Sequence, residues 1–515
     1  MVHEMKSFAI ATVIKYLLVA FVISILLFFT QSAFASKEYE IAAFLAFSIL
    51  AIAITYLTKV SVPLKFFLPG LLFLAAFAIG PILYTLVMSG FQYQTGNYIS
   101  KEQAIERVTA LGVETDEDGT TFDVRVGRLE NGQVALLASD PFVTNQYFLA
   151  TEEARFPLEP STLTLDSDGL ATTAPGFREF ETRELRQLEQ EILQTRFEYQ
   201  NEFFLQLEGS DIAAVKRQKL SYDATSDEFR DLITGDIYRD NGRGNYAKVG
   251  AEDEVLQPGW RSPIWFSHYV DLFTDDKVRG PLIKVFLWTV IFASVTVVTQ
   301  FALGLLVAIA MNKAIIGRRF YRSIFILPYA MPSIMSILIW GGMFETEFGA
   351  INNLLGTDVA WFQNANFARA AVIIVNLWLG FPYFYLVSSG ALQAIPSELS
   401  EAAAIDGANS RQVFSRITLP LLLQILSPLL VASFAFNFNN FNLIFLLTGG
   451  GPRNDLDGEI AGATDILISY TYRIAFGTNI QNLGLASAIS VIIFIIVASI
   501  SLYGIRKSKV LESFK

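Results

Sequence analysis

Four asparagines lie within a stretch of the sequence that is otherwise apolar enough to cross a membrane. The stretch covers residues 433–447 and reads SFAFNFNNFNLIFLL. An amide buried without a hydrogen-bond partner costs roughly 2 to 7 kcal/mol, so each of these side chains requires a partner. That partner is either a neighbouring helix or a ligand that brings donors and acceptors of its own.

Three apolar segments carry polar residues at the spacing of one helix face. In a helix, residues at i, i+3, i+4 and i+7 lie on the same side. The three stripes are Tyr329 and Ser333; Asn376, Leu379, Gly380 and Tyr383; and Ser433, Phe436, Asn437 and Asn440. On the same helical wheel, Asn439 and Asn442 point elsewhere. The first stripe is flanked by Pro328 and Pro332, which bend helices.

The side chains of these stripes predict a binding site for a sugar. Neutral amides and hydroxyl groups suit sugar hydroxyls, which need donors and acceptors but no charge. Phe436 and Tyr383 could cover the apolar face of a pyranose ring, and Gly380 leaves room for that ring. The alternative is that the amides bond neighbouring helices. We favour this alternative for Asn439 and Asn442, and the sugar site for the three stripes.

The composition is that of an integral membrane protein. Of 515 residues, 52% are hydrophobic and only 17% are charged. The sequence has no cysteine, and its only histidines are His3 and His268, so we expect no metal site. The glycine-rich residues 448–455, TGGGPRND, lack the lysine of a phosphate-binding loop. We therefore expect neither a catalytic residue nor nucleotide hydrolysis in this chain.

Eight segments are long and apolar enough to span a bilayer, which takes about 20 residues. They cover residues 12–34, 41–58, 66–89, 283–311, 320–343, 369–391, 420–447 and 483–505. Lysine and arginine concentrate before the first segment, after the last, and in alternate connections between them. The positive-inside rule therefore predicts that both termini are cytoplasmic, and an even number of spans agrees.

Residues 91–281 form an acidic block that this topology places outside. They carry 35 acidic and 19 basic side chains, whereas the rest of the chain carries 14 and 19. Solubility explains such a charge, and a basic docking partner is the sharper alternative. Apolar and polar residues alternate on both sides of Glu130-Asn131-Gly132, which predicts a β-hairpin. Residues 179–204 have the pattern of a charged amphipathic helix, and the turn-rich residues 235–249 predict further short strands.

We therefore expect an all-α polytopic membrane protein with an inserted mixed or mainly β domain. Its parts are residues 1–90 with three spans, residues 91–281 outside the membrane, and residues 282–515 with five spans. The first span has a second interpretation, because Lys6, Lys15, an apolar run and small residues near Ala35 also fit a cleavable signal peptide. Cleavage would leave the orientation of the later spans unchanged.

A polar connection follows the sixth segment. Residues 395–420 read IPSELSEAAAIDGANSRQVFSRITLP and lie on the cytoplasmic side of the predicted topology. The sequence predicts a short helix from Glu398 to Ile405 that ends at Gly407, with Ser410 as the cap of a second helix. Two short helices with an alanine-rich surface can approach another protein closely. An ordinary amphipathic connection is the alternative.

This connection resembles the EAA loop of the membrane subunits of binding-protein-dependent ABC importers. The matching pattern is EAA, three residues, glycine, nine residues and then Ile-x-Leu-Pro. Four further stretches resemble the larger membrane subunit of maltose/maltodextrin importers, namely ILPYAMPS (326–333), IIVNLWLGFPY (373–383), SFAFNFNNF (433–441) and YTYRIAF (470–476). The likeness is strong over residues 282–505. Over residues 1–281 it rests mainly on the layout of three spans followed by a large external domain.

The resemblance implies a permease subunit of an ATP-driven sugar importer in the bacterial inner membrane. In that family the EAA loop sits in a cleft of a separate ATPase subunit, which assigns Glu401, Ala402, Ala403 and Gly407 to coupling. It further implies that the three stripes line the sugar site, that the first helix is retained and that the acidic block is periplasmic. The implied partners are a second permease subunit, two ATPase subunits that bind ATP and Mg, a periplasmic sugar-binding protein, maltose or a maltodextrin, and membrane lipid, with no nucleic acid.

Two other functions compete with this one. An ion-coupled sugar carrier usually needs carboxylates within its spans, and the fourth to eighth segments contain no Asp or Glu. A permease of the same class for another sugar or a polyol fits the composition equally well. Only the resemblance favours maltose over those.

Overall fold

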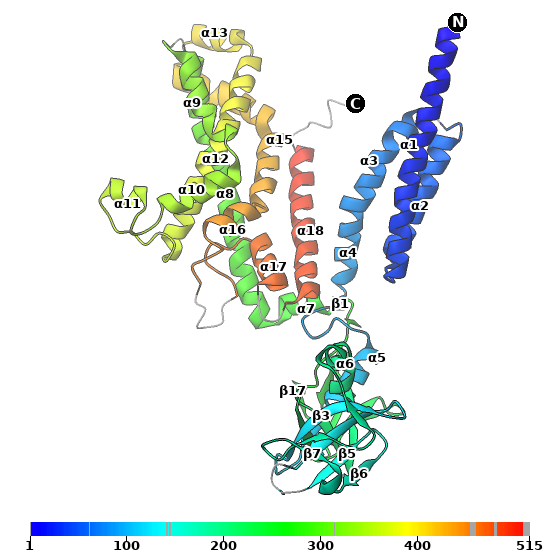
Figure 1. Cartoon of the computed structure of the whole chain (residues 1–515). Helices are drawn as coiled ribbons and strands as arrows, with labels where there is room; N and C mark the ends of the chain where they lie inside the picture. Colours follow the sequence, from blue (N-terminus) through cyan, green and yellow to red (C-terminus); the bar gives the residue numbers. More distant parts are fainter. Residues whose placement is uncertain are drawn as a thin grey trace. The chain divides into compact units, whose positions relative to one another are not determined.

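The structure, a computed structural model, describes residues 2–60, 62–140, 143, 146–313, 315–453, 460–477 and 481–507. It divides the chain into two units, residues 1–88 and residues 89–515. Long helices form in the apolar segments and strands form in the acidic block (Figure 1). The two kinds of secondary structure therefore follow the two solvents that the sequence predicts.

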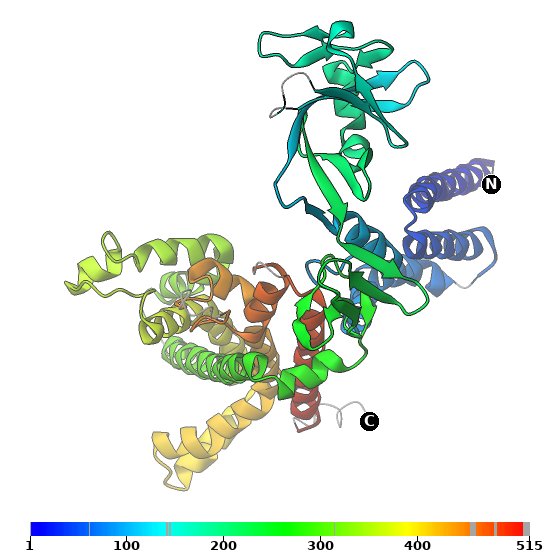
Figure 2. The ribbon, with the colours of Figure 1, turned by 90° about the horizontal axis from the view of Figure 1, so that it is seen from below.

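The first unit is built from long helices. α1 covers Val2–Ala35 and α2 covers Tyr39–Leu57, while α3 (Val62–Leu74), the π-helical turn η1 (Ala75–Ile79) and α4 (Gly80–Met88) follow one another directly. α1 packs along α2, and α2 contacts α3 (Figure 2). Apolar side chains cover the surface of this unit, and Phe66 and Phe77 are 81% and 75% exposed. Such a surface is expected for helices that face lipid.

The acidic block consists of many short strands and two longer helices. The helices are α5 (Lys101–Leu111) and α6 (Thr182–Gln194), and η2 (Pro160–Thr162) is a 3-10 turn. The strands are β1 (Phe91–Gln92), β2 (Val113–Thr115), β3 (Thr121–Leu129), β4 (Val134–Ser139), β5 (Tyr147–Ala150), β6 (Arg155–Leu158), β7 (Thr164–Leu165), β8 (Ala171–Thr173), β9 (Phe177–Glu179), β10 (Phe197–Gln200), β11 (Phe203–Leu207), β12 (Ile212–Gln218), β13 (Leu220–Asp223), β14 (Glu228–Asp231), β15 (Ile237–Asp240), β16 (Tyr246–Lys248), β17 (Ala251–Val255) and β18 (Ser262–Pro263).

These strands form two main antiparallel sheets. The larger follows the order β10-β11-β12-β3-β4-β5-β6, with β2 beside β12 and β9 beside β3, and the smaller is the meander β13-β14-β15-β16-β17. The core of the larger sheet includes Phe122, Leu136, Phe148 and Phe197. β1 pairs with β18, so the chain enters and leaves the β-rich region through one short ribbon.

The predictions for the acidic block are confirmed in part. β3 and β4 form the predicted hairpin, with Arg128 opposite Val134 and Gly132 at φ 89° in the turn. The strands expected in residues 235–249 are β15 and β16. The helix expected over residues 179–204 is wrong beyond Gln194, where the chain forms β10 and β11. Aromatic residues at 197, 199, 203 and 204 favour strands, and several of them pack into the core of the sheet.

The membrane part of the second unit contains the remaining helices. They are α7 (Ser267–Thr274), α8 (Asp276–Asn312), α9 (Arg318–Ala330), α10 (Ser333–Met343), α11 (Ala350–Leu355), α12 (Ala365–Ala394), α13 (Ser397–Ile405), α14 (Ser410–Val413), the π-helical turn η3 (Phe414–Thr418), α15 (Leu419–Phe438), α16 (Phe441–Leu447), α17 (Leu467–Phe476) and α18 (Leu483–Lys507). Among the described residues of the whole chain, seven helices could cross a membrane, or eight spans if the bent pair α9–α10 counts as one.

Two predicted spans are broken. α9 and α10 meet at an angle of 93°, and Pro332, the N-cap residue of α10, explains that break. The seventh segment, predicted as one helix through residue 447, is wrong beyond Phe438, where α15 ends. Asn439 and Asn440 leave the helical conformation, with ψ angles of 23° and 67°, before α16 begins. Asparagine favours such positions because its side chain competes for backbone hydrogen bonds.

Among the described residues, α8 and α12 share the most extensive helix-helix contact of the membrane part. Both are buried along a face that is rich in small residues, including Ala293, Gly304 and Ala308 on α8. A Cβ atom on Gly304 would lie 2.6 Å from Cβ of Phe384 and 2.7 Å from the backbone nitrogen of Tyr385 on α12. Small residues allow such close approach of two helices in a membrane. This pair forms the frame on which the candidate site is built.

Candidate functional site

The residues of the three predicted stripes line one cavity, with a volume of about 570 Å³. Tyr329 and Ser333 come from the two sides of the α9–α10 bend, the second stripe comes from α12, and the third from α15 and the turn after it. The other lining residues are Gln300, Pro328, Met331, Ile337, Ala432, Asn442 and Leu443. The fold thus brings together side chains that lie more than a hundred residues apart.

The rim of the cavity offers polar groups without internal partners. Within the described residues, the hydroxyl groups of Tyr329, Ser333 and Tyr383 and the amide of Asn440 form no hydrogen bond. Phe436 is 69% exposed and Tyr329 is 57% exposed. These groups are available to a ligand that carries hydroxyl groups, and Phe436 offers a flat apolar face.

The floor of the cavity is a chain of hydrogen-bonded amides. Asn376 Nδ2 donates to Asn437 Oδ1 at 2.7 Å, and Asn437 Nδ2 donates to the carbonyl of Ser433 at 2.8 Å. Gln300 Nε2 donates to the backbone carbonyl of Asn376 at 2.6 Å. Gln300, Asn376 and Asn437 are buried, with 3%, 3% and 2% exposure. These amides therefore join α8, α12 and α15, the helix-bonding role that the sequence favours for Asn439 and Asn442.

Gly380 makes room for a protein side chain. A Cβ atom on Gly380 would lie 2.0 Å from Gln300 Nε2 and 2.6 Å from Oε1. The sequence suggests that this glycine leaves space for a sugar ring, whereas in the structure the Gln300 amide lies against it. Gly380 still lines the cavity, and its effect on the site is to let Gln300 reach the wall.

Asn442 and Gln300 line the cavity although the sequence analysis does not place them in the site. The prediction that Asn442 points away from the site is wrong, because the helical wheel assumes an unbroken helix and the break before α16 turns Asn442 toward the cavity. Asn439 is exposed, outside the cavity lining, with its Nδ2 3.4 Å from the carbonyl of Ala435. Gln300 is absent from the predicted stripes. Its signal was that of a single amide inside the apolar segment 283–311.

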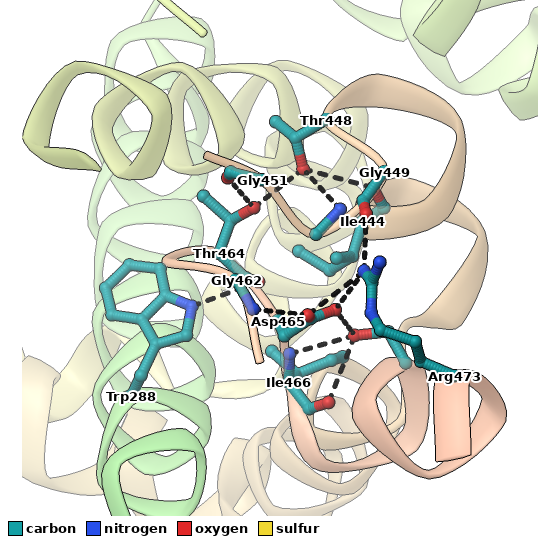
Figure 3. Close-up of polar contacts among 12 residues, drawn as sticks. Trp288, Ile444, Thr448, Gly449, Gly451, Gly462, Thr464, Asp465, Ile466 and Arg473 are labelled. Carbon is teal, nitrogen blue, oxygen red and sulfur yellow. Dashed lines mark hydrogen bonds and ion pairs between the residues drawn. The ribbon is translucent and has the colours of Figure 1, made fainter. Parts of the chain in front are cut away.

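A polar network fixes the end of α16, which carries cavity residues. Thr448 Oγ1 lies 2.7 Å from Thr464 Oγ1, and Thr464 Oγ1 donates to the carbonyl of Gly451 at 2.6 Å (Figure 3). Arg473 donates to the carbonyl of Gly449 at 2.6 Å and pairs with Asp465 at 3.1 Å. The network therefore connects the turn after α16 to α17.

Asp465 is the buried charge of this network. Its side chain is fully buried and also accepts from the backbone nitrogen of Gly462 and from Ser469 Oγ, both at 2.8 Å. Burial raises the pKa of Asp465 to about 6, and the ion pair with Arg473 favours the ionised carboxylate. A Cβ atom on Gly450 would lie 2.0 Å from Asp465 Oδ1, which explains a glycine at that position.

The predicted coupling loop forms two short helices, α13 and α14. A Schellman motif closes the end of α13. Gly407 has φ 83°, its backbone nitrogen donates to the carbonyl of Ala404, and the nitrogen of Ala408 donates to the carbonyl of Ala403. The prediction that Ser410 caps the second helix is wrong by one residue. Asn409 Oδ1 accepts from Gln412 N at 2.9 Å, and the Gln412 side chain accepts from Asn409 N at 2.9 Å.

The surface of α13 is open to solvent. Within α13 no residue is buried, Ile405 is 87% exposed and Leu399 is 44% exposed. α14, η3 and α15 follow one another directly over Ser410–Phe438. The loop is therefore connected through one helical segment to Ser433, Phe436 and Asn437 in the cavity wall.

Comparison with known proteins gives three kinds of match: a family model, solved structures and curated relatives. Residues 300–508 match the family model described as "Binding-protein-dependent transport system inner membrane component". Among solved structures, the crystal structure of a bacterial ABC transporter for import of the acidic polysaccharide alginate has 22% sequence identity, a TM-score of 0.41, and coverage of 48% of this chain and 84% of that one.

Curated relatives cover different shares of the chain. The maltose/maltodextrin transport system permease protein MalF of Salmonella typhimurium is 46% identical over 287 residues, which are 54% of this chain and 56% of that protein. The MalF protein of Vibrio vulnificus is 33% identical over 488 residues, 91% of this chain and 90% of its own length. The chain thus spans little more than half the length of the first relative and most of the second. Because the similarity to the Vibrio vulnificus protein covers most of both chains, this chain belongs to the family of MalF permease proteins, which are multi-pass inner membrane components of binding-protein-dependent ABC importers.

Proposed function

We propose that this chain is the sugar-translocating permease subunit of an ATP-driven importer of maltose and maltodextrins. The observation that carries the proposal is that every residue of the three predicted stripes lines one cavity. The cavity combines neutral hydrogen-bonding groups with Phe436 and Tyr383, which is the chemistry that a neutral sugar needs. The names of the relatives supply the sugar class.

The complex proposed here contains several other chains. A second permease subunit (MalG-like) completes the wall of the cavity, on which Tyr329 and Phe436 are now largely exposed. Two ATPase subunits (MalK-like) bind ATP and Mg, and a periplasmic sugar-binding protein (MalE-like) delivers the sugar. Both termini are cytoplasmic, and the β-rich region is periplasmic, as the distribution of Lys and Arg predicts.

We expect this site to bind sugar with low affinity. A net hydrogen bond contributes about 0.5 to 1.5 kcal/mol. The free polar groups of the rim therefore give only a few kcal/mol after ordering costs, and about −4.1 kcal/mol corresponds to a millimolar dissociation constant. Weak binding suits a permease, because it must release the sugar that it accepts.

Coupling follows from the continuity of the helices. α13 and α14 offer Glu401, Ala402, Ala403 and Gly407 to a cleft of the ATPase subunit. When ATP closes the ATPase pair, the displacement of α14 moves η3 and α15, since the three are continuous over Ser410–Phe438. Ser433, Phe436 and Asn437 move with α15, which exposes the cavity first to one side of the membrane and then to the other.

Reconstitution tests this function. The complete complex in proteoliposomes should take up radiolabelled maltose only when both ATP and the sugar-binding protein are present. Uptake driven by an ion gradient without ATP would identify an ion-coupled carrier instead. Uptake of another sugar or a polyol, with no competition by maltose, would show a permease of the same class with a different substrate.

A further inference from the structure

Gln300 is a buried amide that the stripes do not include and that still reaches the cavity. It lies in the middle of α8, is 3% exposed and lines the cavity. α8 contributes no other residue to the lining. An amide in the middle of an apolar helix is costly unless its groups are paired, so each of its polar atoms needs a partner.

The orientation of the Gln300 amide follows from its contact with α12. The backbone carbonyl of Asn376, at 2.6 Å, can only accept a hydrogen bond. The atom that faces it must therefore be Nε2, and Oε1 lies on the other side of the amide. Among the described residues, Oε1 accepts no hydrogen bond and keeps some accessible surface, and Gln300 lines the cavity. Gln300 thus presents one acceptor without a partner.

Gly380 places this acceptor at the wall. Its missing side chain leaves the space in which the amide lies, since a Cβ atom there would be 2.6 Å from Oε1 and 2.0 Å from Nε2. Gly380 itself lines the cavity. Any larger residue at 380 would push the Gln300 side chain away from this position.

The neighbouring amides are already engaged. Asn437 donates to Ser433 and accepts from Asn376, so both ends of its amide have partners within the protein. Asn376 uses its Nδ2 on Asn437, which leaves Oδ1 as an acceptor. The floor of the cavity therefore presents acceptors, from Gln300 and Asn376, whereas the rim presents hydroxyl groups that can donate as well.

We propose that Gln300 is a further specificity-determining residue of the sugar site, whose Oε1 accepts a hydrogen bond from one hydroxyl group of the bound sugar. The inference rests on the proposed function. It specifies the polarity of the contact: the group of the sugar that faces the floor is a donor. A sugar that carries hydrogen in place of that hydroxyl leaves Oε1 without a partner.

A set of monodeoxy maltoses tests the proposal in the complete reconstituted complex. Wild-type complex should prefer maltose over the analogue that lacks the critical hydroxyl by about two- to tenfold in transport efficiency, the range of a net hydrogen bond. Gln300→Met keeps the length and burial of the side chain and removes its polar atoms. We expect it to lose the preference against that one analogue and to keep the preferences against the others. Since both complexes use the same sugar-binding protein, its own selectivity cancels.

Gln424→Met is the matched control. Gln424 is exposed on α15 and outside the cavity lining, so the same chemical change there should leave every preference as in the wild type. The proposal is overturned if Gln300→Met shows the wild-type pattern for all analogues, or if the wild type does not discriminate among them. Absence of maltose uptake by the wild type would instead overturn the proposed function.

A structure decides the matter independently of the variants, for instance if Gln300→Met prevents assembly. A cryo-EM map of the wild-type complex with maltose in the cavity should place Gln300 Oε1 within about 3.2 Å of a sugar oxygen, the outer limit of a good hydrogen bond. A sugar that fills the cavity with no oxygen near Oε1 would show that Gln300 only joins α8 to α12.

Discussion

Two of the predicted sugar residues have a second role at the level of single side chains. Asn376 and Asn437 are paired with each other at 2.7 Å and are almost fully buried. In the structure they hold α12 against α15, and a sugar can use only the groups that this pairing leaves free. Among the described residues, the side chain of Asn440, in the turn after α15, forms no such hydrogen bond. Substitutions at these positions should therefore have different consequences.

Asn437→Leu should lower the stability of the protein. It leaves Asn376 Nδ2 buried without its acceptor, which costs about 1 to 3 kcal/mol. The midpoint of thermal unfolding of the purified complex should fall accordingly. The double variant Asn376→Leu, Asn437→Leu removes both partners and should recover part of the loss, because replacing a whole pair can be nearly neutral. Additive losses in the double variant would contradict the pairing.

Asn440→Leu should impair transport and leave stability unchanged. The loss of one sugar contact predicts a decrease of about two- to tenfold in transport efficiency, measured as uptake in proteoliposomes. Hydrolysis of ATP stimulated by the sugar-binding protein should continue, since α13 and α14 are intact. Asn439→Leu is the control, because Asn439 is exposed and outside the cavity lining. Equal effects of the two variants would argue against a sugar contact at Asn440.

At the scale of helices and strands, the sequence predicts where apolar helices lie better than it predicts where a helix is interrupted. Hydropathy identifies α8, α12 and α18, because a span needs a long apolar run. It does not report the end of α15 at Phe438, since residues on both sides of the break are apolar. The helical spacing of Ser433, Phe436 and Asn437 is real, whereas Asn440 reaches the same cavity through a turn.

The candidate site shows the same limit. Stripes on separate helices predict which face of each helix is polar, and the cavity contains all three. The single amide in the apolar segment 283–311 marks Gln300 as a residue that needs a partner, but the sequence does not show that this partner is the backbone of another helix. The role of Gly380 likewise depends on a residue eighty positions earlier in the chain. The roles of Gln300 and Gly380 depend on contacts between helices, which a single sequence does not give.

Gly407 provides a prediction for the predicted coupling loop. At φ 83° it occupies the left-handed region, which costs an L-residue roughly 1 to 2 kcal/mol. Gly407→Val should distort the end of α13, so that transport and the stimulation of ATP hydrolysis by the sugar-binding protein fall together. Basal hydrolysis by the isolated ATPase subunits should not change.

Gly390→Ala is a control for the loss of a glycine at an unstrained position. Gly390 lies in α12, and a Cβ atom there would meet nothing within 4 Å. This variant should transport as the wild type does. If Gly407→Val also transports normally, the left-handed turn is unimportant and the loop is a simple connector.

For the whole molecule, charge and hydropathy divide the chain between water and lipid. The block with 35 acidic and 19 basic side chains is the β-rich region, and the apolar remainder forms the long helices. This division could be read from composition alone. The strand order and the pairing of β1 with β18 could not, because they depend on contacts between distant segments.

Single cysteines can test the predicted topology, since the natural chain has none. Ser210 is exposed in the β-rich region, and Ile316 is 97% exposed between α8 and α9. In cells with a permeable outer envelope, Ser210→Cys should react with a membrane-impermeant thiol reagent. Ile316→Cys should react only after the inner membrane is opened. The reverse labelling would place the β-rich region in the cytoplasm.

The close packing of α8 and α12 has a consequence for the proposed transport cycle. With Gly304 against Phe384 and Gln300 bonded to Asn376, these two helices cannot slide without losing many contacts. The breaks at Pro332 and at Asn439–Asn440 interrupt the helices that form the other walls. We therefore expect the wall built from α8 and α12 to move less than the walls that contain these two breaks. A substitution at Pro332 should then change the rate at which the sugar leaves the cavity more than it changes which sugar is accepted.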